Sequence, residues 1–221
     1  MNSTVGWPER PDHLTLFRIA TRSTVLGPGR RSVLWVQGCP FSCPGCVVPE
    51  SLPFSGGVAY PVAELAGRIV ADNDIDGVTF SGGEPMSQAA GLCELVDRIR
   101  AVRDLSFMSY TGFTLEQLRS RGTRSQRALL ERLDILVDGP YVRARHTDLI
   151  WRGSDNQRVI LLTERHRSLE EKLDERGTWI EFEVHAGGVA WMGIPRPGFR
   201  KDFEELMRAQ GINLSPEGGG V

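Results

Sequence analysis

Lysine is nearly absent from this chain of 221 residues, in which only Lys172 and Lys201 occur. The other basic residues are arginines, a bias that indicates a GC-rich coding sequence of the kind found in aerobic soil bacteria. The formal net charge is only −2, so no overall basic field attracts nucleic acid or an anionic membrane. We therefore expect partners that are neither nucleic acids nor membranes.

Long apolar runs are absent as well. No stretch approaches the roughly 18–20 apolar residues that a membrane-spanning helix needs. Residues 1–18 are polar, contain Pro8 and Pro11, and lack the apolar centre of a signal peptide. We predict a cytoplasmic protein. Its length, with 40% apolar and 24% charged residues, suits one α/β domain with a small addition.

Strand-like and helix-like patterns alternate through the first three quarters of the chain. This rhythm predicts an α/β fold, with a parallel sheet or partial (β/α) barrel and right-handed crossovers. Ligands of such folds bind at the carboxyl ends of the strands. A Ser87 cap is expected to start the second helix. The expected strands are 14–23, 32–37, 77–80, 105–110, 135–137 and 157–162, and the expected helices are 61–71, 87–102, 115–119 and 126–132.

The last quarter has a different pattern. Residues 178–184 alternate in polarity, Ala186-Gly187-Gly188 can form a turn, and residues 189–194 resume a strand pattern, which together predict a β-hairpin. Residues 198–209 read as a closing helix. We therefore divide the chain into a core at 1–164, a hairpin and helix appendage at 165–213, and a disordered tail at 214–221.

Cysteine is scarce, and three of the four cysteines fall within eight residues. Cys39, Cys43 and Cys46 follow the buried strand 32–37, whereas Cys93 lies in an expected helix as a small core residue. Thiolates are the ligands of iron–sulfur clusters, and three of them leave one iron of a [4Fe–4S] cube open to a small molecule. The alternatives are a zinc site completed by a distant ligand and an electron-transfer cluster. The sequence contains no second pair of ligands that would complete a zinc site. It also has no fourth cysteine near the other three, which an electron-transfer cluster usually needs.

The Cys-x3-Cys-x2-Cys spacing resembles the radical S-adenosylmethionine (SAM) superfamily. The chain is most similar to its anaerobic ribonucleotide reductase activating proteins, which activate a glycyl-radical enzyme. Five segments carry this resemblance in order across residues 14–162: 27–46, Ser81-Gly-Gly-Glu-Pro85, Tyr110-Thr-Gly-Phe113, 134–141 and 152–158. The resemblance implies a partial barrel of the radical SAM type. It also implies two cofactors, which are SAM and a [4Fe–4S] cluster bound by Cys39, Cys43 and Cys46.

The resemblance also implies which residues contact SAM. Ser81–Pro85 follows an expected strand, so Gly82, Gly83 and Glu84 are predicted to hold the methionine amino group, although the motif alone could be a simple turn. The backbone near Gly45 and Val47 is expected at the adenine. The family often has an aromatic or His, then Asn, after the third cysteine, where this chain has Val47 and Val48.

Three further positions complete the predicted cofactor site. Tyr110 and Thr111 end a strand beside it. Asp138 is an ordinary turn residue by its local sequence, whereas the resemblance to glycyl-radical activating enzymes implies a cation ligand near the cofactor carboxylate. The role of a family signature that includes Arg152, Asn156 and Gln157 cannot be derived from these residue types.

Three functions stay open on the sequence. The first is an activase that cleaves SAM reductively to a 5′-deoxyadenosyl radical and passes it to a partner glycyl-radical enzyme. The second is a radical SAM enzyme that modifies a peptide or small metabolite, favoured by the appendage, by Val47-Val48 and by an aerobic source. The third is a non-catalytic metal-binding scaffold. For the enzyme readings, the superfamily implies flavodoxin or ferredoxin as the electron donor.

Overall fold

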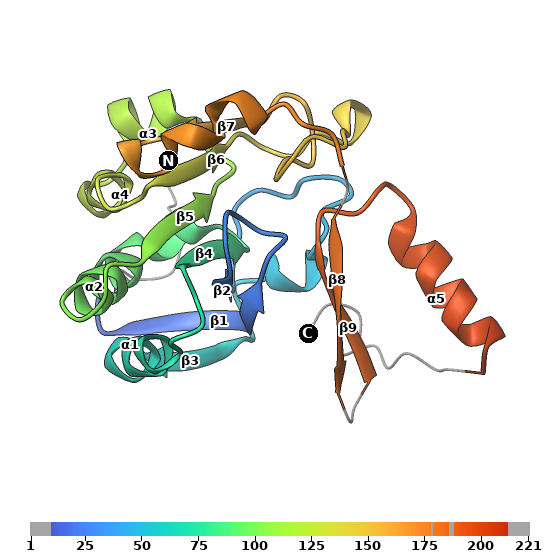
Figure 1. Cartoon of the computed structure of the whole chain (residues 1–221), viewed down its shortest axis with the longest axis horizontal. Coiled ribbons are helices and arrows are strands. Elements are labelled where there is room, and N and C mark those ends of the chain that lie inside the picture. Colours follow the sequence, from blue (N-terminus) through green and yellow to red (C-terminus); the bar gives the residue numbers. More distant parts are fainter. Residues whose placement is uncertain (1–9, 178, 186–187, 212–221) are drawn as a thin grey trace.

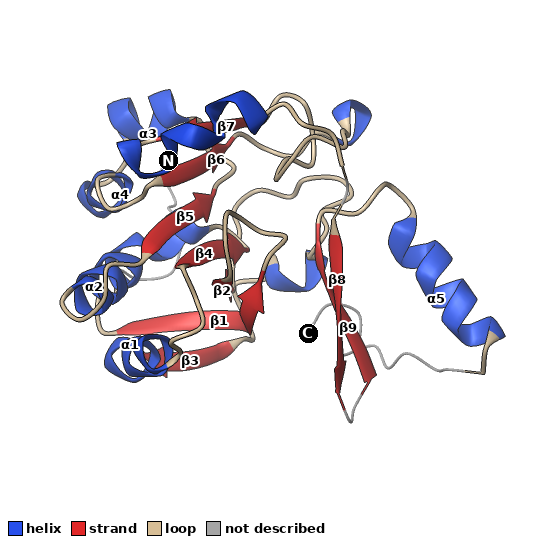
Figure 2. Cartoon of the chain, in the orientation of Figure 1, coloured by secondary structure: helices blue, strands red, loops and turns tan. Residues whose placement is uncertain are grey.

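A seven-stranded mixed sheet and a separate two-stranded hairpin form the β-structure of the computed structural model, which describes residues 10–177, 179–185 and 188–211 (Figures 1 and 2). The predicted disordered tail lies outside these residues. The strands are β1 (His13–Ser23), β2 (Arg31–Val36), β3 (Val58–Pro61), β4 (Gly77–Gly82), β5 (Ser106–Tyr110), β6 (Ile135–Asp138), β7 (Arg158–Leu161), β8 (Ile180–His185) and β9 (Gly188–Gly193). The helices are α1 (Val62–Ala71), α2 (Ala89–Arg100), α3 (Leu115–Arg121), α4 (Arg124–Leu130) and α5 (Phe199–Ala209), with short 3-10 helices at η1 (Pro49–Ser51), η2 (Pro85–Gln88), η3 (Arg143–Arg145) and η4 (Glu164–Lys172).

The strand order of the large sheet is β3-β1-β2-β4-β5-β6-β7, and its four central neighbours β2, β4, β5 and β6 run parallel. The predicted α/β class and the parallel core are confirmed. The expected strand 157–162 is present as β7, but it runs antiparallel to β6. The reason is the connection at 139–157, which holds no crossover helix to bring the chain back in the same direction.

The two faces of the large sheet have different coverings. Helices α1, α2 and α4 cover one face, on the left in Figure 1, and the hairpin β8–β9 stands on the other side. Strand β2 shows the period of two that a sheet requires. Leu34 and Val36 pack in the main core with the helices, whereas Val33 and Trp35 belong to a smaller cluster with Met192 of the hairpin.

Two local details differ from the predictions. Ser87 does not cap α2, because Pro85–Gln88 forms a separate 3-10 turn in which Glu84 accepts a hydrogen bond from Met86 N at 2.8 Å. Helix α2 then begins at Ala89. The short edge strand β3 was not predicted, and its last residue, Pro61, is the cap of α1. No helix within the described residues is long and apolar enough to cross a membrane.

Arg31 holds the amino ends of the parallel strands together. Its side chain is 0% exposed, and its guanidinium donates to Thr79 Oγ1 at 2.7 Å, to Ser106 Oγ at 2.8 Å, and to the carbonyl oxygens of Val78 at 2.8 Å and Pro28 at 3.0 Å. Burial lowers the pKa of Arg31 to about 10, so the group stays charged at neutral pH. A buried charge without hydrogen-bond partners would strongly destabilise the fold. The segments around Arg31 must therefore be packed so that they supply these acceptors.

Replacement of Arg31 by Met is expected to lower the free energy of unfolding by about 3–5 kcal/mol, because several buried acceptors lose their donor together. Urea unfolding followed by circular dichroism measures this change. The matched control is Arg30→Met, which removes an exposed ion pair to Asp74 and should shift the midpoint little. Equal shifts for the two variants would show that the Arg31 bonds do not stabilise the sheet.

Candidate cluster and cofactor site

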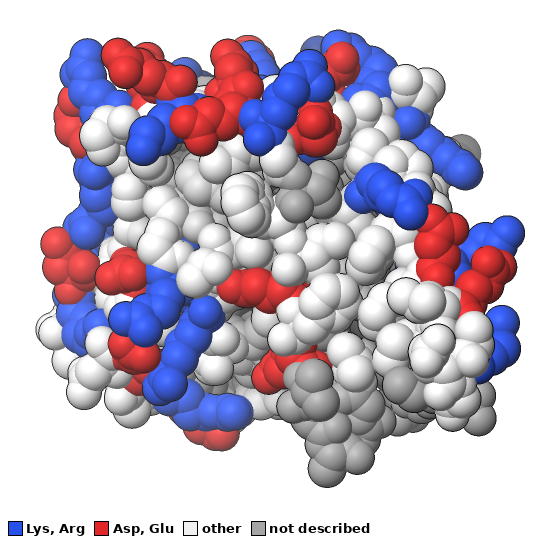
Figure 3. Space-filling view, turned by 45° about the vertical axis from the view of Figure 1, so that its right-hand side comes forward, with Lys and Arg blue, Asp and Glu red and all other residues white. Residues whose placement is uncertain are grey.

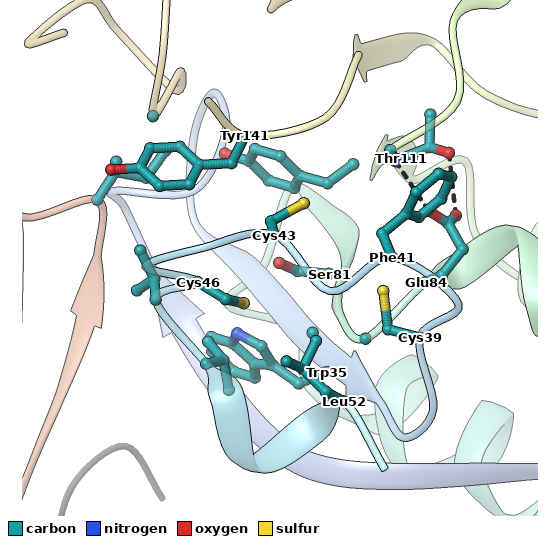
Figure 4. A pocket seen from close by; sticks show the side chains of 18 of the residues that line it. Trp35, Cys39, Phe41, Cys43, Cys46, Leu52, Ser81, Glu84, Thr111 and Tyr141 are labelled. Atoms are coloured by element: carbon teal, nitrogen blue, oxygen red, sulfur yellow. Dashed lines mark hydrogen bonds between the residues drawn. The ribbon is translucent and has the colours of Figure 1, made fainter. Parts of the chain in front are cut away.

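The carboxyl ends of β2, β4 and β5 border one pocket, and the three predicted cluster cysteines line it (Figure 4). Cys39, Cys43 and Cys46 all come from the loop that follows β2. Figure 4 shows their side chains projecting from this loop around a common space, with Ser81 from the end of β4 beside them. The parallel register pairs Val36 with Gly82, which places the cysteine loop next to the glycine loop.

Backbone hydrogen bonds close the base of the cysteine loop. Gly38 N donates to Ser51 O at 2.8 Å, and Cys39 N donates to Leu52 O at 2.9 Å. The hydroxyl of Ser51, which is fully buried, donates to Val48 O at 2.7 Å. The loop is therefore fixed at both ends while its cysteines stay partly accessible.

The thiols of Cys39 and Cys46 are protonated at neutral pH when no cluster is bound. Burial raises the pKa of Cys39 to about 12 and also raises the pKa of Cys46. Ligation to iron would therefore release their protons. Within the described residues, no three His, Cys, Asp or Glu side chains are placed to hold a single metal ion. A [4Fe–4S] cluster needs its three cysteines farther apart than a single metal ion does, because each cysteine binds a different iron atom.

Gly82 and Gly83 are required by the packing of the protein's own backbone. Gly82 has φ +92°, and a Cβ there would lie 2.7 Å from Trp35 Cα. A Cβ on Gly83 would lie 2.4 Å from Gly38 O. The near neighbour is therefore strand β2 at Gly82 and the base of the cysteine loop at Gly83. Both glycines also line the pocket.

Glu84 joins this loop to the loop after β5. Its carboxylate is 1% exposed and accepts hydrogen bonds from Thr111 Oγ1 at 2.9 Å, Gly112 N at 2.8 Å and Met86 N (Figure 4). Burial raises the pKa of Glu84 to about 7, and the three donors oppose that rise. The Glu84 carboxylate therefore links the loop after β4 to the loop after β5, and both loops border the pocket.

The remaining predicted cofactor residues divide into two groups. Val47, Tyr110 and Thr111 line the pocket. The Tyr110 hydroxyl is buried and has no hydrogen-bond partner among the described residues. Gly45 is not part of the lining, since it turns with φ +82° beside Arg143.

Asp138 is also outside the pocket lining. Its buried carboxylate accepts from Leu115 N at 2.7 Å and pairs with both Nε and a terminal nitrogen of Arg158. The bond to Leu115 stabilises the first turn of α3. Asp138 therefore does not join the other predicted cofactor residues in the pocket lining, and its oxygens are bonded within the protein.

The signature residues whose role the sequence left open brace the loop at 139–157. Gln157 lines the pocket, accepts from Gly153 N at 2.9 Å and donates to Gly139 O at 2.9 Å. Asn156 donates to Pro140 O at 2.8 Å. Arg152 pairs with Asp174 and donates to Leu173 O.

The sequence did not predict another part of the pocket lining. It is formed by Trp35, Arg18 and residues 191–194 of the hairpin segment. The guanidinium of Arg18 lies 5.0 Å from the centre of the Trp35 ring. One signal was present in the sequence: Arg18 stands within the expected strand 14–23, and a charged residue buried in a strand needs a partner nearby.

Replacement of Glu84 by Ala should lower the free energy of unfolding of the cluster-free protein by about 2–4 kcal/mol, because three buried donors lose their acceptor. Urea unfolding measures the change. The control is Glu94→Ala, which removes an exposed pair with Arg98 on α2 and should cost under about 0.5 kcal/mol. A loss at Glu84 no larger than at Glu94 would contradict this role of Glu84.

Comparisons with known proteins agree with this geometry. Residues 25–160 match the model of the 4Fe-4S single cluster domain. Anaerobic ribonucleoside-triphosphate reductase-activating proteins are 37% identical in Vibrio cholerae, over 60% of this chain and 88% of that protein, and 34% identical in Escherichia coli, over 61% and 90%. A pyruvate formate-lyase-activating enzyme of Clostridium pasteurianum is 34% identical over 35% of each chain. The chain therefore belongs to the 4Fe-4S single cluster domain family and to the anaerobic ribonucleoside-triphosphate reductase-activating proteins within the radical SAM enzymes, with a [4Fe–4S] cluster and SAM as cofactors.

Proposed function

We propose that this chain activates a partner glycyl-radical enzyme, such as an anaerobic ribonucleotide reductase, by generating a radical from SAM. One observation carries the proposal. The three cysteines of the family motif and the Gly-Gly-Glu loop line the same pocket, although they come from loops after different strands. The Vibrio cholerae and Escherichia coli relatives are named for activation of that reductase.

Cys39, Cys43 and Cys46 would hold the cluster, and the fourth iron would stay open for the methionine end of SAM. When bound and reduced by one electron, the cluster supplies the cleavage of the sulfonium bond that yields a 5′-deoxyadenosyl radical. The partly buried cysteine loop keeps its shape through its own backbone bonds, so the ligands are arranged before the cluster binds.

The Gly-Gly-Glu loop would receive the methionine amino group. The Glu84 carboxylate already accepts three protein donors, so we assign it the role of fixing the backbone at Gly82 and Gly83. That backbone then faces the amino group as a fixed set of polar atoms. Val47, Tyr110 and Thr111 border the same space.

The surrounding features of the proposal follow from the same family. The mixed sheet would be a partial barrel of the radical SAM type, open at one side to the partner's glycine segment. A flavodoxin or ferredoxin would deliver the electron. The cytoplasm, where thiols stay reduced, is the compartment that suits the three cluster-ligating cysteines.

A second function has one observation in its favour. Residues of the C-terminal hairpin segment line the pocket, and they lie beyond the family match at 25–160. A pocket with an additional wall suits a small metabolite or a thin peptide as hydrogen donor. Electron paramagnetic resonance separates the two functions: a glycyl radical on the partner enzyme supports the activase, and its absence alongside a modified small substrate supports the second function.

Replacement of Cys39, Cys43 or Cys46 by Ala should abolish 5′-deoxyadenosine formation after anaerobic reconstitution with iron, sulfide, SAM and a strong reductant, because each substitution removes a cluster ligand. Product is measured by liquid chromatography, and iron by elemental analysis. Cys93→Ala is the matched control, because Cys93 lies in α2 and its thiol contacts Ser125 O; it should retain activity.

Two outcomes would contradict the proposal. Full turnover in any one of the three ligand variants would mean that another residue holds the cluster. Zinc without iron in the wild-type protein, and no 5′-deoxyadenosine, would favour the metal-binding scaffold instead.

A further inference from the structure

The C-terminal hairpin is attached to the pocket rather than to a distant surface of the core. Strands β8 and β9 lie outside residues 25–160, which match the family model. The alignment to the Vibrio cholerae protein covers 88% of that protein but only 60% of this chain. This chain therefore has additional structure beside the sheet face that the helices leave uncovered (Figure 1).

Arg18 of β1 is the first attachment. Its side chain is 5% exposed, and its guanidinium lies over the Trp35 ring. One terminal nitrogen donates to Trp191 O of β9 at 3.2 Å, and the other pairs with Glu183 of β8 at 3.2 Å. A single buried cation therefore links both strands of the hairpin to β2, the strand that precedes the cysteine loop.

Two further contacts attach the hairpin and α5 to the core. Thr24 donates through its backbone N and its hydroxyl to Glu181 of β8, at 2.8 and 2.6 Å. Arg200 of α5 pairs with Glu50 of the cysteine loop at 2.7 Å. Since Glu50 itself lines the pocket, the extension is joined to the loop that carries the cluster ligands.

The pocket side of this extension is apolar. Met192 is 6% exposed and packs with Trp35, and Val48 and Ile194 border the same cluster. All four residues line the pocket. Figure 3 shows that Lys and Arg side chains gather mainly at the edges of this view, while its middle consists mostly of uncharged side chains with some acidic ones among them.

We propose that the hairpin is a fixed wall of the SAM pocket, and that Met192 and Ile194 together with Trp35 and Val48 receive the adenosine group. This proposal rests on the proposed function. SAM has a charged methionine end and a flat, uncharged adenine end. The polar loop at 81–84 and the cysteines suit the charged end, whereas an aromatic and thioether surface suits a purine. The wall also keeps water from the reacting carbon.

Equilibrium dialysis of the anaerobic, cluster-loaded full chain tests the proposal with three probes: SAM, S-adenosylhomocysteine and methionine. Met192→Ala should weaken both adenosyl compounds about tenfold, the loss of one good base contact, and leave methionine unchanged. Arg18→Met should weaken the same two compounds, because the wall loses its attachment. The matched controls are Met207→Ala on α5 and Arg22→Met on β1, where Arg22 pairs with Asp72 on the surface. Both control variants should bind all three probes as the wild-type protein does.

Hydrogen exchange of the wild-type protein provides a second measurement that does not depend on variants. Binding of S-adenosylhomocysteine should slow amide exchange at residues 191–194. Unchanged adenosyl affinity in Met192→Ala, equal weakening of methionine, or no slowing at 191–194 would overturn the wall. Failure of the wild-type protein to bind any SAM would instead overturn the proposed function, so the two failures are distinguishable.

Discussion

The close contact between the loops after β2 and β4 is the constraint on which the pocket depends. Gly83 N donates to Val36 O at 2.8 Å and Glu84 N donates to Gly38 O at 2.9 Å, which leaves no room for a Cβ on Gly83. Cys39 follows Gly38 directly, so displacement of this contact displaces the first cysteine. Glu84 then extends the contact to the loop after β5 through its bonds to Thr111 and Gly112. Three loops from three parallel strands thus form one unit before any cofactor binds.

The sequence predicted the parts of this arrangement that follow from local patterns. Strand alternation, the cysteine spacing and the position of Ser81–Pro85 after a strand were enough to place the loops at one sheet edge. The sequence did not predict which residues form hydrogen bonds or ion pairs with the buried carboxylates of this site. Asp138 is paired with Arg158, a residue distant in sequence, and Glu84 is used by donors from the next loop. Such pairings depend on tertiary packing, which no residue reveals by its type alone.

Arginine has a larger structural role than we would expect if its abundance reflected only a GC-rich coding sequence. Arg31 links the amino ends of β2, β4 and β5, Arg18 links the hairpin to β2, and Arg158 neutralises Asp138. Each case uses several donors of one planar group at once, which a lysine ammonium cannot reproduce with the same geometry. The low lysine content is therefore compatible with the demands of this fold, because the buried sites need forked donors.

The wall formed by the hairpin bears on how a partner reaches the pocket. In the proposed reaction the radical must meet its hydrogen donor before water or a buffer molecule does. A core without the extension would leave the surface of Trp35 and Val33 uncovered, and a partner enzyme would have to cover it. In this chain Met192 packs on that surface already. The partner then needs to fill only the remaining opening, and a narrow glycine segment, which has no side chain, fits such an opening better than any other residue.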